Sequence, residues 1–228
     1  MIPMKVPEVK IEEVKPGIFG VFLDDGYHLP MLFCRVQEFY ESDNEEFRGN
    51  KFSIWRYMEW YSKSRSGSFS YPSDWSGFNI PFEILEQCYD IHGEDETPYD
   101  GVMRWIIQEI HKRKPDGSLA YVIGVGSSDE DETVLEHEIC HGMYYIDTEY
   151  RAKADSITEN LESEYGKEFK KFRKNLLSMG YHEGVIKDEL HAYLISSPLS
   201  SSFSKGVDAG VCWKIHESYR NSMGLSIG

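Results

Sequence analysis

The pentad His137-Glu138-Ile139-Cys140-His141 restricts the local fold more than any other segment of this chain. Two histidines four residues apart lie on the same face of an α-helix, where both imidazoles can bind one metal ion. Ile139 and Cys140 are apolar and no proline interrupts the segment, which suits a helix with one face packed on a core. The sequence therefore predicts a helix here, with a metal site on one side of it.

Glu138 gives this predicted metal site a chemical role. It is the neighbour of the first histidine, and its carboxylate can reach the open coordination position of a metal held by His137 and His141. There it can take a proton from a metal-bound water, as in zinc hydrolases with the H-E-x-x-H pattern. In the alternative interpretation, the two histidines are ordinary helix residues hydrogen-bonded in a polar pocket.

Two histidines do not complete a catalytic zinc site, which usually has three protein ligands and leaves the fourth position to water. The short spacing that would supply a third histidine is absent, because Tyr144 and Asp147 occupy the decisive positions. A carboxylate from a later helix is the remaining common solution. Glu189 is the preferred candidate because its segment has an apolar helical face, and Glu149 and Asp188 remain alternatives.

Glu189-Leu190-His191-Ala192 completes a pattern that resembles the gluzincin metallopeptidases. In that superfamily H-E-x-x-H on one helix is followed by E-x-x-A or E-x-x-S on a later one. The resemblance covers roughly residues 119–196 and identifies no subfamily. It implies one zinc ion held by the pentad histidines and Glu189, with the pentad glutamate as general base. Tyr193, one turn after Glu189, is a candidate for stabilising the tetrahedral intermediate or orienting a ligand, and Tyr144 is another.

The predicted function is zinc-dependent hydrolysis of a peptide bond in a peptide or protein substrate. Two alternatives remain. One is a binding protein that keeps a zincin-like shape and hydrolyses nothing, although the general base Glu138 is present. The other is a metal-dependent amidase that acts on a non-peptide substrate.

Charge is distributed unevenly along the chain. Residues 1–150 hold 13 Lys and Arg against 29 Asp and Glu, while residues 151–228 hold 11 against 10. This negative excess argues against nucleic acid as a partner, because phosphates would be repelled. It is consistent with attraction of basic substrates, and also with plain solubility.

The chain carries no sign of a membrane segment or a secretory signal. It has no run of about 18 apolar residues, and its first residues lack an apolar core. The cysteines are far apart and form no C-x-x-C pair, so we expect reduced thiols and a cytoplasmic protein. They are Cys34, Cys88, Cys140 and Cys212.

Periodicity and composition predict an α+β, zincin-like fold. Residues 1–17, with three prolines, predict an extended N-terminal arm. Residues 18–228 predict a single catalytic domain, with an N-terminal lobe to about residue 148 and a helical lobe over 149–228. The apolar run 119–125 predicts a strand at the edge of a small mixed sheet, packed on the active-site helix, where an extended peptide could pair with it.

Other segments are predicted with less detail. Residues 51–63 fit either a helix or a strand, because crowded aromatics do not distinguish the two. Residues 64–80 are rich in serine, glycine and aromatics and predict the longest loop, a candidate lining for a substrate cleft. The remaining predictions are strands at 18–23 and 29–36 and helices at 81–92, 98–114, 149–178 with an interruption at Gly166, and 183–196.

Overall fold

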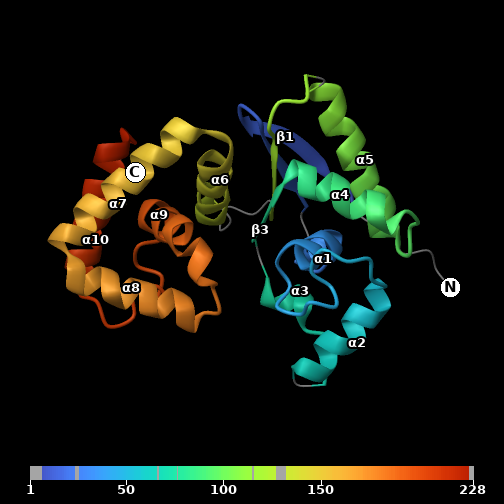
Figure 1. The fold of residues 1–228 in the computed structure, drawn as a ribbon, viewed down its shortest axis with the longest axis horizontal. Coiled ribbons are helices and arrows are strands. Elements are labelled where there is room, and N and C mark those ends of the chain that lie inside the picture. Colours follow the sequence, from blue (N-terminus) through green and yellow to red (C-terminus); the bar gives the residue numbers. More distant parts are fainter. Residues whose placement is uncertain are drawn as a thin grey trace. The chain divides into compact units, whose positions relative to one another are not determined.

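The structure, a computed structural model, describes residues 7–23, 26–65, 67–75, 77–114, 116–126 and 132–225. It is a mixed α+β protein with a four-stranded sheet and a largely helical remainder (Figure 1). The chain divides into two units, unit 1 (Met1–Glu132) and unit 2 (Thr133–Gly228). The division falls after the first residue of the pentad helix, whereas the sequence pattern placed the lobe boundary near residue 148. Cys140 of that helix belongs to the core of unit 2, which explains the difference.

The sheet lies in unit 1 and has the strand order β1-β2-β4-β3. β1 (Lys10–Lys15), within the predicted arm, pairs antiparallel with β2 (Ile18–Phe22). β2 runs parallel to β4 (Tyr121–Val125), and β4 runs antiparallel to β3 (Gly77–Pro81). The strands predicted over 18–23 and 119–125 are therefore confirmed.

The predicted edge position of strand 119–125 is wrong. β4 is hydrogen-bonded to β2 on one side and to β3 on the other, and all five of its residues are buried. Its backbone is thus not available to pair with an extended peptide. An apolar run without alternation is typical of a strand buried on both faces, and it does not reveal which neighbours the strand has.

The strand predicted at 29–36 is also wrong, because these residues lie in α1 (His28–Glu41). Every residue from Leu29 to Phe39 is buried, so the segment lacks the polar face that reveals a helix by its period. Pro30 lies in the first turn, where a missing N–H removes no intrahelical bond.

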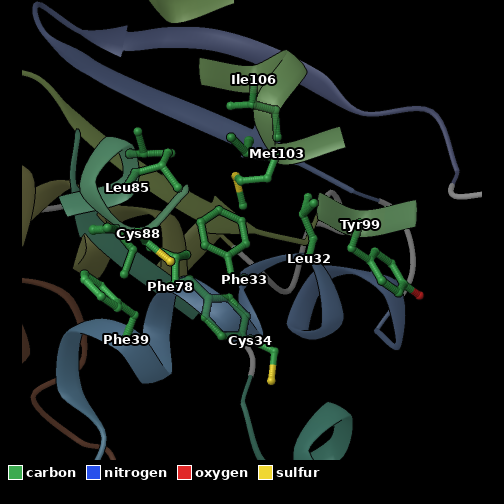
Figure 2. Close-up of a cluster of buried hydrophobic side chains, with 14 of the residues drawn as sticks. Leu32, Phe33, Cys34, Phe39, Phe78, Leu85, Cys88, Tyr99, Met103 and Ile106 are labelled. Carbon is green, nitrogen blue, oxygen red and sulfur yellow. The ribbon is translucent and has the colours of Figure 1, made fainter. Parts of the chain in front are cut away.

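The core of unit 1 is built around α1, which packs against β3 and β4. Figure 2 shows Phe33 of α1 surrounded by buried side chains from the neighbouring elements. Its ring stacks on Phe78 of β3, with ring centroids 5.0 Å apart. Gly124 in β4 leaves room for this ring, since a Cβ there would collide with it.

The rest of unit 1 is helical. Residues 64–80 are not one long loop as predicted, because they contain the short helix α3 (Tyr71–Asp74) and most of β3. The predicted helices at 81–92 and 98–114 are confirmed, and the undecided segment 51–63 is a helix. These helices are α2 (Ile54–Ser64), α4 (Phe82–His92) and α5 (Pro98–Arg113).

Unit 2 consists of helices around its own apolar core. Asp147 caps the helix that follows the pentad by accepting hydrogen bonds from the backbone N–H groups of Glu149 and Tyr150. The predicted interruption at Gly166 is confirmed, since one helix ends and the next begins there. The elements are α6 (Glu132–Ile146), α7 (Thr148–Glu164), α8 (Gly166–Ser178), a 3-10 turn (Glu183–Val185), α9 (Ile186–Ser196) and α10 (Ala209–Met223).

The described residues also bear on the expectations about membrane segments and cysteines. None of the helices described is both long and apolar enough to cross a membrane. All four cysteines are buried and free.

Candidate metal centre

α6 places the two pentad histidines on one helix face, as the sequence predicts. The rings of His137 and His141 have centroids 4.8 Å apart, and their Nε2 atoms are 3.1 Å apart. His141 is buried and His137 is half-buried. Cys140, between them in sequence, packs into the core of unit 2 and holds this face of the helix in place.

Glu189 of α9 completes the cluster. Its Oε1 lies 3.6 Å from Nε2 of His141, and its Oε2 lies 3.7 Å from Nε2 of His137. The three ligand atoms all lie within 4.8 Å of one another. Among the residues described, no other group of three His, Cys, Asp or Glu side chains converges in this way. Of the two alternative ligands, Glu149 is exposed at the start of α7, and Asp188 contacts the far side of the His141 ring.

Hydrogen bonds on the outer side of the His137 ring determine its tautomer. Nδ1 of His137 lies 3.1 Å from Oγ of Ser196, and this hydroxyl donates to the carbonyl oxygen of Ala192 at 2.9 Å. Because the hydroxyl proton is already used, we assign Oγ as the acceptor for a proton on Nδ1. Nε2 of His137 then carries a lone pair directed into the cluster.

Asp188 has the equivalent role for the second histidine. Its Oδ2 lies 3.0 Å from Nδ1 of His141 and accepts the proton there. Burial lowers the pKa of His141, but the carboxylates of Asp188 and Glu189 outweigh this and raise it to about 10. Burial also raises the pKa of Asp188, and the facing histidines His141 and His191 bring it down to about 2. A pocket that stabilises a proton this strongly also attracts a metal cation.

The donor set fits one zinc ion. With the outer ring protons assigned as above, both Nε2 atoms face the carboxylate of Glu189, and a metal ion would replace the proton that the carboxylates stabilise on His141. The Oε2 atom of Glu189 is buried and has no hydrogen-bond partner among the described residues. Zinc bound tetrahedrally at about 2.0–2.1 Å places neighbouring ligand atoms about 3.3 Å apart. The two Nε2 atoms are 3.1 Å apart, and each lies within 3.7 Å of a Glu189 oxygen, a different oxygen for each histidine.

Glu138 follows His137 on α6 and is buried. Its negative charge contributes to the raised pKa values of His141, Tyr181 and Tyr193, so its carboxylate lies near these groups. Glu138 is therefore a buried acid close to the ligand cluster.

Tyr193, predicted as a candidate, lies beside the cluster. Its ring meets that of His137 edge-on, with centroids 4.7 Å apart, and stacks on Phe203. Its hydroxyl is 3.3 Å from that of Tyr181, which the sequence pattern did not reveal. Tyr181 lies in the connection between α8 and α9, and a single aromatic in such a segment has no distinctive spacing. Burial, together with the charges of Glu189 and Glu138, raises the pKa of both tyrosines.

Tyr144 and His191 form a neighbouring layer. The hydroxyl of Tyr144, the other predicted candidate, donates to Oδ1 of Asp155 at 2.7 Å, so it is not directed at the ligand cluster. The Tyr144 ring stacks on His191, which is fully buried. His191 is not one of the three converging ligands, but it bonds to Asp188.

Comparisons of the chain with protein-family models, with curated proteins and with solved structures find no significant match. What the cluster can do is therefore inferred from its own residues and their geometry.

Proposed function

We propose that this protein is a zinc-dependent metallopeptidase of the gluzincin type, with a zincin-like arrangement of α6 and α9. His137, His141 and Glu189 hold one zinc ion, and Glu138 is the general base. The observation that carries the proposal is the convergence of two imidazole Nε2 atoms and an unpartnered, buried carboxylate oxygen. A motif of five residues and a glutamate from a separate helix bring three ligand atoms within 4.8 Å of one another, which supports a shared metal ion.

The proposed reaction divides the work between the ion and the side chains. Bound zinc supplies a Lewis acid that polarises the scissile carbonyl and lowers the pKa of the attacking water. Glu138 accepts the proton of that water on a carboxylate oxygen and passes it to the leaving amine. Ser196 and Asp188 keep the two imidazoles in the tautomers that present Nε2 to the ion.

Tyr193 and Tyr181 are the proposed donors to the oxyanion of the tetrahedral intermediate. Burial and nearby negative charge raise the pKa of both, so their hydroxyls keep their protons at neutral pH. A donor directed at a developing oxyanion typically contributes about 3 kcal/mol to transition-state stabilisation. The two hydroxyls lie 3.3 Å apart, close enough for both to reach one oxyanion.

The first experiment is zinc analysis of the purified protein, followed by a peptide-library assay that includes basic sequences. We expect about one zinc per chain, loss of zinc in His137→Ala, and cleavage that Glu138→Gln abolishes while retaining zinc. His182→Asn is the matched control, because His182 caps the 3-10 turn through Nδ1 and asparagine can replace that cap.

Three outcomes would decide against the proposal. A protein that binds no zinc lacks the site. Full activity in Glu138→Gln would show that Glu138 is not the general base. Zinc binding without cleavage of any peptide favours the binding-protein alternative, while cleavage restricted to non-peptide amides favours the amidase.

A further inference from the structure

His191 joins the metal cluster to helix α7 through a continuous row of hydrogen bonds. Its Nδ1 lies 3.2 Å from Oδ1 of Asp188 and 3.0 Å from the backbone carbonyl oxygen of the same residue. Its Nε2 lies 3.0 Å from the hydroxyl of Tyr150. The other oxygen of Asp188, Oδ2, contacts His141. One carboxylate is therefore held between two histidines, and only His141 belongs to the ligand cluster.

The protons of this row can be assigned from the partners. Nδ1 of His191 faces two acceptors on Asp188, so it carries the proton and donates it. Nε2 then accepts from the hydroxyl of Tyr150. Every group in the row has a partner, and the direction of donation runs from Tyr150 through His191 to Asp188.

Asp188 needs such support more than its neighbours do. Its side chain is 27% exposed, whereas those of His141 and His191 are 4% and 0% exposed. A partly exposed carboxylate can rotate toward water and release Nδ1 of His141. The bond from His191 opposes this rotation, and the hydroxyl of Tyr150 in turn keeps the His191 ring oriented.

We propose that His191 and Tyr150 are positioning residues that set the zinc affinity of the cluster by holding Asp188 against His141. This inference rests on the proposed function, because it concerns the same metal site. Helix α7 supplies no ligand, but through Tyr150 it would contribute to the zinc affinity of the cluster. In the simpler interpretation His191 is a buried histidine that only packs between Tyr144 and Tyr150.

The test is a Zn²⁺ titration of the metal-free full-length protein against a chromophoric chelator. Tyr150→Phe should weaken zinc binding about 3- to 10-fold, and Asp188→Asn about 10- to 100-fold. Tyr144→Phe is the matched control, because it removes the bond to Asp155 but leaves a ring to stack on His191. It should bind zinc like the wild type.

A double variant separates positioning from packing. If Tyr150 acts through Asp188, then Tyr150→Phe should have no further effect on zinc affinity in the Asp188→Asn background. Additive effects would overturn the inference, as would a Tyr150→Phe variant whose zinc affinity is unchanged while its metal-free melting temperature falls. Failure of the proposed function gives a different result. In that case the wild-type protein does not bind zinc at His137, and His137→Ala leaves its zinc binding unchanged.

Discussion

Each unit buries a cluster of histidine and acidic side chains, and the two clusters are balanced in different ways. In unit 1 the guanidinium of Arg35 bonds to both oxygens of Asp100, to Glu96 and to the carbonyl of Phe52. His92 uses one ring nitrogen for the carbonyl oxygen of Cys88 and the other for the backbone N–H of Phe52. The chain itself supplies the positive charge there, and every member of the cluster is satisfied.

In unit 2 the carboxylates face imidazoles rather than a guanidinium. Asp188 is satisfied by His141 and His191, but Oε2 of Glu189 has no partner among the described residues and faces an imidazole nitrogen. A buried acceptor without a donor costs free energy, and a bound cation would offset that cost. The charges of the Arg35 cluster are balanced within the chain, whereas the cluster in unit 2 leaves an acceptor over, as the proposed metal site requires.

The largest expected effect concerns Glu138, the proposed general base in unit 2. Glu138→Gln keeps the size of the side chain but cannot accept a proton, so kcat/KM on a cleaved peptide should fall about 10²- to 10⁴-fold. Zinc content should stay at the wild-type level. Glu136→Gln on the same helix is the control, because Glu136 pairs with Arg220 outside the cluster and should have little effect on turnover. Unchanged turnover in Glu138→Gln would show that Glu138 is not the general base.

The next largest effect should be on the stability of unit 1. Arg35→Met leaves Asp100 and Glu96 without their cation, which typically costs about 3–5 kcal/mol in the free energy of unfolding. Chemical denaturation would measure it. Arg56→Met is the control, because Arg56 and Glu46 are half-exposed and such pairs contribute about 1 kcal/mol or less. If the Arg35→Met protein folded but bound no zinc, the Arg35 cluster would not be purely structural, and the contrast between the two clusters would be wrong.

A substitution of Glu189 should affect zinc binding more than stability, the reverse of Arg35→Met. Glu189→Gln removes a proposed ligand, so zinc affinity should fall more than about 100-fold, beyond the loss expected for an outer hydrogen bond. The metal-free protein should lose less stability than Arg35→Met does, because Asp188 still faces His141 after one of the carboxylates that raise the pKa of this histidine is removed. Calorimetry of metal-free protein and a zinc titration measure the two quantities. A destabilised variant with normal zinc affinity would show that Glu189 is structural, like Asp100.

The smallest effect should come from the outer bond of His137. Ser196→Ala removes the acceptor for Nδ1, so the ring can turn or change tautomer, and zinc affinity should fall about 3- to 10-fold. Ser197→Ala is the control, since that hydroxyl reaches Ser196 at 3.3 Å but not the histidine. Equal zinc affinities in the two variants would show that Ser196 does not hold the ring.

The pentad could be recognised from the sequence because its geometry is local. Residues four apart on a helix share a face whatever the tertiary structure, so the positions of His137 and His141 followed from spacing alone. The strands at 18–23 and 119–125 and the helices at 81–92 and 98–114 were also predictable, because their apolar patterns or boundaries were distinct. The segment 29–36 was not, because α1 is buried on all sides and an apolar run of that kind fits either element.

The sequence by itself determined which residues could bind a metal, and that Glu189 was the best candidate for a third ligand. The tertiary structure alone decided which of two consecutive acids faces the ligand cluster. Residues adjacent on a helix point about 100° apart, so the packing of α9 against α6 directs Glu189 toward the lone pairs and Asp188 toward the outer side of His141. The central position of β4 was likewise a tertiary outcome, because its partners β2 and β3 lie far from it in the chain. Spacing along one helix is fixed by covalent geometry, whereas contacts between distant segments are set by packing over the whole unit.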